Sequence, residues 1–492
     1  MGVHAENAEE GTAAAVRLAR GAPLRSTVDA TDPAAWLTLD AGVREVFGYR
    51  SPVAHTGPPP VNPAQDEESR LALALCHGDG RVREKAVRRS AGRPGLLPLI
   101  VIRCADWADP VRGSARHLLR EALDADAAVG LAPLILRVGR RDRGAFGVEL
   151  LGEVMRRASP DRLAPLLTSP DRSARRFAHR LAIDEGLLGP VELARTAARD
   201  EDTVVQDLCA TAALAALTDL PSGQAQEADE TDGAGRADAA ARAYEAVLAP
   251  LLSARHPRTR SAGVTALRRA GLSERAEAFL GDRSSLVRAC ARYVVRQHGG
   301  DPTAWYREWC TAAADPGLPP GAVVGLAESG NRPDAVLLWP LLDHPAGGVR
   351  EGAVIGLRLL DSVVTDRLRP LLDDPAARVV RETAVALLPS AGQLPADWLL
   401  ERLTGPQQHV RHAAFRLLDA RGGIEALRAA VGLLADPDTR LRIRAGQSVL
   451  RWRPPADVRR HDPEVAELLD RSRHLFSPYG LLRLKWEAGL TG

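Results

Sequence analysis

The chain has almost no lysine, few aromatic residues and no closely spaced cysteines. Only Lys85 and Lys485 are lysines, so arginine supplies nearly all of the positive charge, a bias that GC-rich coding in a bacterial protein explains without a functional reason. Aromatic residues make up 4% of the chain. Because alanine and leucine are abundant instead, the composition favours helices packed through small and aliphatic side chains. The five cysteines form no CxxC pair, which excludes a zinc knuckle and a disulfide framework and predicts a reducing cytoplasm.

Long apolar runs are missing as well. No stretch of about 18 apolar residues occurs, and the first residues do not have the basic-then-apolar pattern of a signal peptide. We therefore expect a soluble, cytoplasmic protein with no membrane partner. The formal net charge of +2 argues against a protein that coats nucleic acid generally, although a local basic stripe stays open. With 45% apolar residues in 492, the chain can bury a large core.

A helical pattern recurs about every 30 residues. After Val111-Arg112, small or apolar residues follow at positions +4, +7 and +8 from the valine, which is one face of an α-helix. The same template returns at Val287-Arg288, Val349-Arg350, Val380-Arg381 and Val410-Arg411, with weaker copies between them. The twelve slots fall at 83, 112, 144, 175, 205, 260, 288, 320, 350, 381, 411 and 442. Eleven steps thus contain one departure, the 55 residues from 205 to 260, which predicts a twelve-unit array.

Each unit also has a first helix, visible as an apolar run that ends in an Asp-Pro or His-Pro turn, as in "DRLRPLLDDP" and "AVLLWPLLDHP". Helix-turn-helix units with a Pro-bearing turn and a D-P-x-x-x-V-R-x-x-A-x-x-x-L second helix resemble HEAT repeats. The short period is similar to that of the compact HEAT-like repeats of the bilin lyase-type family. The resemblance covers about residues 67–456 and implies an all-α, right-handed solenoid of about twelve repeats, each stacked on its neighbours.

The composition divides the chain into five parts. Residues 1–66 do not fit the repeat and include a Pro-rich stretch, so we expect a non-repeat extension. Repeats 1–5 follow at 67–220, and the acidic, small-residue segment 221–240 predicts a disordered insertion. Repeats 6–12 occupy 241–456. The segment 457–492 breaks the pattern and predicts helices that cap the last repeat.

The recurring arginine is the most regular polar feature. The resemblance implies that it forms a structural ladder, in which each arginine pairs with turn aspartates or carbonyl groups of adjacent repeats. The predicted ladder arginines are Arg83, Arg112, Arg175, Arg260, Arg288, Arg350, Arg381, Arg411 and Arg442.

Two further groups could bind a ligand. Arginines at helical spacing in the first four repeats could align into a basic stripe that meets phosphates or an acidic partner. The residues of this stripe are Lys85, Arg88, Arg89, Arg116, Arg120, Arg172, Arg176 and Arg180, and the alternative is a solvated face offset by nearby carboxylates. Trp305, Tyr306 and Trp309 could form an aromatic platform, although a core stripe has the same spacing.

Enzyme signatures are largely absent, so we expect no enzyme, no cofactor and no metal. The chain has no phosphate loop, no GxSxG and no HExxH motif. The di-iron hydroxylases built on similar repeats need His-Glu pairs, and no histidine here precedes a glutamate. His409 and His412 are three residues apart without a supporting carboxylate pattern. HEAT-like DNA glycosylases use Trp, Asp and Arg around an extruded base, and "DWADPVR" (residues 106–112) has these residue types without a full site.

These observations predict a non-catalytic scaffold that binds a partner protein along the concave surface of the solenoid. Two alternatives stay open at this point. One is a nucleic-acid binding protein or HEAT-like DNA glycosylase that uses the basic residues of repeats 1–4. The other is a bilin lyase-like chromophore chaperone, which the repeat resemblance suggests.

Overall fold

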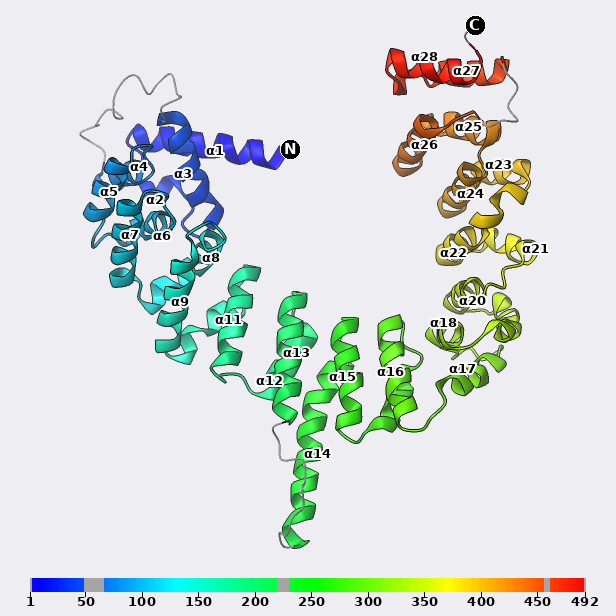
Figure 1. Ribbon diagram of the computed structural model, residues 1–492, viewed down its shortest axis with the longest axis horizontal. Coiled ribbons are helices and arrows are strands. Elements are labelled where there is room, and N and C mark those ends of the chain that lie inside the picture. Colours follow the sequence, from blue (N-terminus) through cyan, green and yellow to red (C-terminus); the bar gives the residue numbers. More distant parts are fainter. Residues whose placement is uncertain (1, 48–65, 219–229, 455–460, 491–492) are drawn as a thin grey trace. The chain divides into compact units, whose positions relative to one another are not determined.

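The computed structural model describes residues 2–47, 66–218, 230–454 and 461–490 (Figure 1). These residues form helices and turns, and no strand occurs among them. The chain divides into two compact units, Met1–Thr259 and Arg260–Gly492. The expected all-α solenoid is confirmed, because successive helix pairs stack on their neighbours along each unit.

The first unit opens with a helical hairpin ahead of the repeats. Helices α1 (Gly2–Ala19) and α3 (Pro33–Phe47) flank the short α2 (Leu24–Thr27). The two long helices cross closely at Gly11 and Gly42. A β-carbon at Gly42 would lie only 2.1 Å from the carbonyl carbon of Gly11, so the crossing leaves no room for a side chain there. The predicted extension 1–66 is therefore helical over residues 2–19 and 33–47, while its Pro-rich part lies outside the described residues.

Six helix pairs follow in sequence. The first helices are α4 (Glu67–Leu75), α6 (Leu97–Arg103), α8 (Ala125–Val138), α10 (Ala164–Leu167), α12 (Pro190–Arg199) and α14 (Glu230–Leu252). The second helices are α5 (Gly80–Arg89), α7 (Asp109–Ala122), α9 (Ala145–Arg157), α11 (Arg172–Asp184), α13 (Thr203–Thr218) and α15 (Pro257–Arg269), the last of which contains the boundary between the units.

Six more pairs lie in the second unit. Their first helices are the 3₁₀ segment η4 (Ser273–Phe279), α17 (Pro302–Thr311), α19 (Ala335–Leu338), α21 (Thr365–Leu368), α23 (Ala396–Leu403) and α25 (Gly423–Gly432). The second helices are α16 (Ser285–Gln297), α18 (Pro320–Ser329), α20 (Gly347–Leu359), α22 (Ala377–Leu387), α24 (Gln408–Arg421) and α26 (Thr439–Arg451). Prolines inside the first helices limit α19 and α21 to one turn, after which the chain continues as the 3₁₀ segments η6 (Pro340–Asp343) and η7 (Arg369–Asp373).

The apolar template of the second helices forms the core. Val349, Ala353 and Leu357 of α20 are fully buried, and α20 packs on both α18 and α22. In the first unit α7 buries the equivalent stripe and packs on α5 and α9. Small residues at the middle position of the stripe let neighbouring helices approach closely. Because the stripe is buried against an adjacent repeat, a single repeat cannot close its core.

The sequence predicted a disordered insertion at 221–240 and capping helices at 457–492. Residues 221–229 of the expected insertion lie outside the described residues, but residues 230–240 belong to α14 and are helical, not irregular. Their sequence is rich in alanine, a strong helix former, which favours the helix. At the other end, α27 (Pro463–Arg471) packs on α25, while α28 (Pro478–Glu487) leaves Tyr479, Leu482 and Trp486 exposed.

Candidate binding groove

The recurring arginine has a fixed place in the helix pair. Eight of the nine predicted ladder arginines are the fourth residue of their second helix. From this position the Arg350 Nη1 atom donates to the carbonyl groups of His344 and Pro345, at 2.7 and 3.0 Å. Arg83, Arg112, Arg175, Arg288 and Arg442 each donate to the carbonyl six residues earlier in the same way. The arginine thus satisfies carbonyl groups of the turn that no helix can satisfy.

Arg112 and Arg442 bond only within their own helix pair, whereas other ladder arginines also reach the next repeat. Arg350 binds Asp374 through two hydrogen bonds of 2.7 and 2.8 Å, and Arg83 and Arg260 bind Asp106 and Asp282 in the same bidentate way. Arg411 binds Asp436, Arg175 lies 3.6 Å from Asp200, and Arg288 binds Glu328 instead of a turn aspartate. Because these side chains are used to join repeats, they are not available to a ligand.

Arg381 differs from the other eight. It is the fifth residue of α22, and the fourth is Val380, which is fully buried. The arginine side chain is 63% exposed and contacts Glu351 and Glu382, which are partly buried. The sequence Val379-Val380-Arg381 fits the Val-Arg template in a register shifted by one residue, and burial of both valines decides the register. Arg381 is therefore not part of the ladder.

Gln206 takes the ladder position in α13, where the template missed it. It is the fourth residue of that helix, and its Nε2 atom donates to the Asp200 carbonyl at 2.5 Å, six residues earlier. The sequence signal was a glutamine at the ladder position. Its side-chain amide can donate to the same turn carbonyl as an arginine does, but it carries no charge.

The basic stripe predicted for repeats 1–4 is not one continuous surface. Arg88 and Arg89 pair with Glu84 and Glu67, Arg176 binds Asp202, and Arg116 donates to the Cys104 and Arg143 carbonyl groups. Arg120 lies over the ring of Phe146. Lys85 on α5 and Arg172 and Arg180 on α11 are exposed without a carboxylate partner among the described residues. Lys85, Arg120, Arg172 and Arg180 thus lack a carboxylate partner among the described residues, and they are spread over α5, α7 and α11.

The aromatic cluster of α17 is not a flat platform. Tyr306 is fully buried, and its hydroxyl donates to the Leu280 carbonyl at 3.0 Å. Burial raises the pKa of this hydroxyl. Trp305 and Trp309 are partly buried and contact each other edge to face, with ring centroids 5.0 Å apart. Each ring therefore serves as a packing partner for its neighbours.

The stretch "RCADW" forms a structural junction between α6 and α7. Both carboxylate oxygens of Asp106 are occupied, one by Arg83 and the Ala108 amide and the other by Arg83 and Arg103. Burial opposes the ionised form of Asp106, but these bonds prevail and lower its pKa. Burial also raises the pKa of Cys104 to about 12, so its thiol is not a nucleophile at neutral pH. These residues hold three elements together and have no free group for catalysis.

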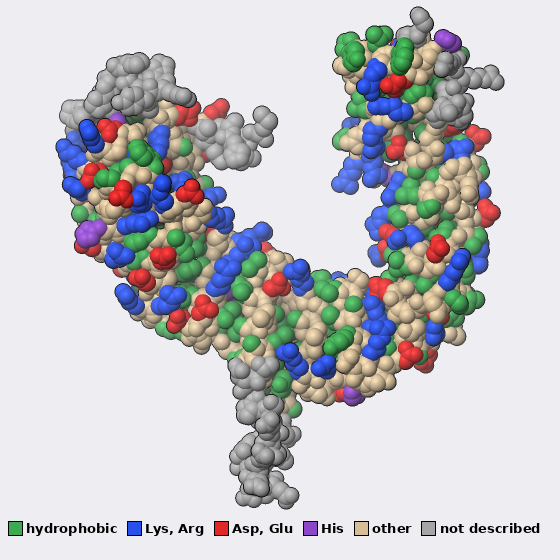
Figure 2. Space-filling model, viewed as in Figure 1, with side chains coloured by type: hydrophobic (Ala, Val, Ile, Leu, Met, Phe, Trp, Pro, Cys, Tyr) green, Lys and Arg blue, Asp and Glu red, His purple; other side chains and the backbone are tan. Residues whose placement is uncertain are grey.

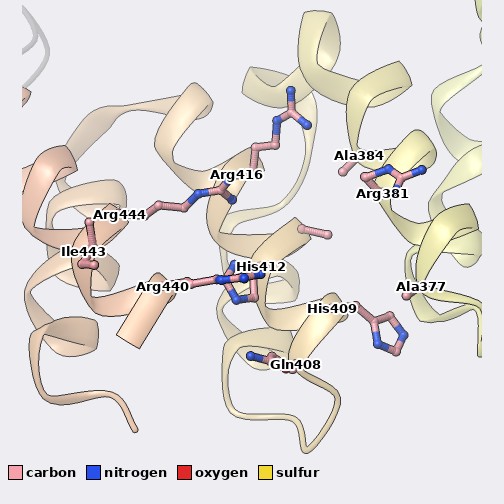
Figure 3. Close-up of a pocket in the computed structure, with 11 residues that line it drawn as sticks. Ala377, Arg381, Ala384, Gln408, His409, His412, Arg416, Arg440, Ile443 and Arg444 are labelled. Carbon is pink, nitrogen blue, oxygen red and sulfur yellow. The ribbon is translucent and has the colours of Figure 1, made fainter. Parts of the chain in front are cut away.

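A pocket of about 590 Å³ opens on the second helices of the last three repeats (Figure 3). It lies over α22, α24 and α26, where Lys and Arg side chains gather in the space-filling view (Figure 2). We call it the basic groove, and its lining residues are Ala377, Arg381, Ala384, Gln408, His409, His412, Ala413, Arg416, Arg440, Ile443 and Arg444.

The helix geometry explains why these side chains converge. Arg440 and Arg444 are four residues apart on α26 with Ile443 between them, and His412 and Arg416 are four apart on α24, so each pair shares one face. Figure 3 shows Arg440 extending toward His412 and Arg444 extending toward α24. The groove therefore collects side chains of like charge from two successive repeats.

Polar contacts join α24 and α26 on either side of these arginines. Near the start of the helices, Gln408 and His412 bond to Asp438 at 2.7 and 2.6 Å, and farther along Ser448 bonds to Asp419. The bonds from Gln408 and His412 hold the pKa of Asp438 well below its usual range, and this carboxylate also caps α26. Arg416, Arg440 and Arg444 have no carboxylate partner in the described part of the chain. The groove thus keeps three arginines exposed to solvent.

The two histidines of the groove do not form a metal pair. The His412 Nε2 atom bonds to Asp438, whereas the His409 Nε2 atom lies 3.4 Å from the Asp374 carbonyl oxygen, so the rings face different repeats. Over residues 2–47, 66–218, 230–454 and 461–490, no group of three or more His, Cys, Asp or Glu side chains is placed to hold a metal ion. No helix among these residues is long and apolar enough to cross a membrane.

No protein-family model matches the chain, and neither does any curated protein. Among solved structures, the chain is similar to the karyopherin Kap121p bound to RanGTP, with 12% identity, a TM-score of 0.32, and coverage of 85% of this chain and 51% of that one. Kap95p, solved with RanGDP, shows 10% identity and a TM-score of 0.35 over 97% of this chain and 66% of that one. A microtubule polymerase TOG domain array shows 9% identity and a TM-score of 0.22, with coverage of 76% and 98%. The chain spans about half the length of Kap121p.

Proposed function

We propose that the protein is a non-catalytic scaffold that binds a partner protein along the exposed faces of its second helices, with the basic groove as a principal contact. The observation that carries this proposal is the division of the arginines into two sets. The ladder arginines are joined to turn carbonyls and carboxylates, whereas Arg416, Arg440 and Arg444 line a pocket without carboxylate partners in the described chain.

Several candidate catalytic groups among the described residues are already engaged or buried. Asp106 of the "DWADPVR" stretch is saturated with hydrogen bonds, and burial raises the pKa of the Cys209 and Cys310 thiols to about 12. A general base needs a free oxygen within reach of substrate, and a cysteine nucleophile needs a thiolate. These features favour binding over catalysis.

A tagged pull-down from native lysate tests the proposal. We expect a stoichiometric protein that survives nuclease treatment and is lost with the double variant Arg440→Glu/Arg444→Glu. The matched control is Arg172→Glu/Arg180→Glu, which makes the same charge change on exposed arginines of another second helix, α11.

Three outcomes would contradict the scaffold proposal. Recovery that disappears with nuclease would support the nucleic-acid alternative, because phosphate contacts dominate such binding. A recovered complex that absorbs visible light would support the chromophore-chaperone alternative. Equal recovery with both double variants would show that the partner does not use the basic groove.

A further inference from the structure

We infer that the basic groove binds an extended acidic segment of the partner protein, one that carries an apolar side chain between its carboxylates. This inference rests on the proposed scaffold function and specifies its ligand. Carboxylates would contact Arg416, Arg440 and Arg444, and the apolar side chain would cover Ile443.

The positive charge in the groove favours an anionic ligand. Arg444 extends from α26 toward α24, on which Arg416 also lies, so arginines of both helices line the groove (Figure 3). Positive charges gathered in one groove raise the free energy of the unbound state, and an anion bound in the groove lowers it. Asp438, which caps α26, already accepts bonds from Gln408, His412 and two backbone amides. The guanidinium groups therefore retain their donors for a ligand, and each can bind a carboxylate through two parallel bonds.

Arg381, at the opposite side of the groove, offers less positive charge to an anionic ligand. Its Nη2 atom lies 3.2 Å from Glu351 and its Nε atom 3.2 Å from Glu382, so its charge is already offset. Ala377 and Ala384, on the same face of α22, leave room for a main chain to pass over that helix. An extended segment lying across the three helices would thus meet open positive charge over α24 and α26 only.

The apolar part of the groove favours a peptide over a nucleic acid. Ile443 is 56% exposed and lies between Arg440 and Arg444 on the surface of α26. An exposed aliphatic side chain flanked by charges suits a side chain of a peptide, whereas single-stranded nucleic acids are held by stacking on aromatic rings. None of the residues that line the groove is aromatic except for the two histidines, of which His412 is tied to Asp438.

Fluorescence anisotropy with defined probes tests the inference on the full-length protein. The first probe is a fluorescein-labelled 12-residue peptide of alternating Glu and Asp with one central Leu. The second replaces the Leu by Ser, the third replaces every acidic residue by Lys, and the fourth is a labelled single-stranded 12-nucleotide DNA. Wild type, Arg440→Glu/Arg444→Glu, Ile443→Ala and the control Arg172→Glu/Arg180→Glu are compared, with far-UV circular dichroism to verify that each variant is folded.

We expect the acidic Leu peptide to bind wild type with an affinity that falls as salt is raised. The groove double variant should weaken it by at least about tenfold, and the control double variant by less than about twofold. Ile443→Ala should weaken the Leu peptide by about threefold and leave the Ser peptide unchanged. The Lys peptide should not bind.

Several results would overturn the inference. Tighter binding of the DNA than of the acidic peptides would reassign the groove to nucleic acid, and equal losses in both double variants would reduce the effect to net charge. If no acidic peptide binds while the pull-down still yields a partner that depends on Arg440 and Arg444, the scaffold proposal stands and this ligand assignment fails. If that dependence is also missing, both fail.

Discussion

Arg350 and Arg381 lie in adjacent repeats and both follow a valine in the Val-Arg pattern. Their structural environments nevertheless differ. Arg350 joins two turns through four hydrogen bonds, and its side chain and that of Asp374 are 13% and 5% exposed. Arg381 is 63% exposed and contacts Glu351 and Glu382, whose side chains are 19% and 17% exposed. Removing one partner of a buried ion pair leaves the other charge without compensation, whereas exposed pairs contribute little.

Replacing Arg350 by Ala should therefore destabilise the second unit by about 3 kcal/mol. Arg381→Ala should change the stability by less than about 0.5 kcal/mol. Thermal unfolding followed by circular dichroism measures both variants under the same conditions. Equal shifts would mean that the ladder contributes no more than a surface contact.

The ladder carboxylates predict a pH dependence. Burial alone would raise the pKa of Asp374, but the bonds from Arg350 and the Ala376 amide hold it below its ordinary value. A carboxyl whose pKa is lowered by folding stabilises the fold above its unfolded pKa of about 3.9, and this contribution is lost as the pH falls through the lower folded value. The stability difference between wild type and Asp374→Asn should be constant from pH 7 to about 5 and shrink below about pH 4. Urea titrations across this range measure it, and a constant difference down to pH 2 would refute the assignment.

At single residues, the sequence pattern located most ladder arginines but misplaced Arg381 and missed Gln206. An arginine at a fixed period, preceded by valine at five of the positions and by Ala, Thr or Leu at the others, identifies eight ladder positions. Val379-Val380-Arg381 offers two registers, and only the burial of Val380 separates them. Gln206 was missed because an amide makes the same carbonyl bond without the charge that defined the search.

At the scale of the helix, alanines of the second-helix stripe set the distance between repeats. Ala353 of α20 and Ala414 of α24 are at most 1% exposed, at positions where the neighbouring helix packs. Larger side chains there would push the helices apart, since a packed core has no spare volume.

Ala353→Leu and Ala414→Leu should each cost about 1–3 kcal/mol through overpacking. The matched control is Ala377→Leu, which places the same group on the exposed side of α22 in the groove and should change the stability by less than about 0.5 kcal/mol. Thermal unfolding of the three variants provides the comparison. Unchanged unfolding in both core variants would show that the helix register is wrong.

The basic groove could not be predicted from the sequence of any one helix. Arg440 and Arg444 share a face of α26, and Arg416 follows His412 on α24, so spacing alone shows two short basic faces. Whether they meet depends on how α24 and α26 are joined, and the bonds from Gln408 and His412 to Asp438 are tertiary. The same limit applies to the stripe of repeats 1–4, where the helical spacing was correct but carboxylates from elsewhere in the fold bind Arg89 and Arg176.

At the scale of the whole chain, each repeat packs mainly on the repeats next to it. In the second unit α20 contacts α18 and α22, and α22 contacts α24; in the first unit α5 contacts α7, and α11 contacts α13. A molecule with only neighbour contacts loses stability locally when one interface is weakened, because its free energy is close to a sum over repeats and interfaces.

Hydrogen–deuterium exchange of Arg350→Ala should therefore show a local change. Backbone amides of α18, α20 and α22 should exchange faster than in wild type, since Arg350 joins the turns that position these helices. Amides of α5, α7 and α11 should keep their wild-type rates, because no ladder contact of Arg350 reaches them. Ala353→Leu should give the same local pattern through a different cause. A uniform rise in exchange over both units would show instead that the array opens as one cooperative body, and the ladder would then stabilise the whole chain and not single interfaces.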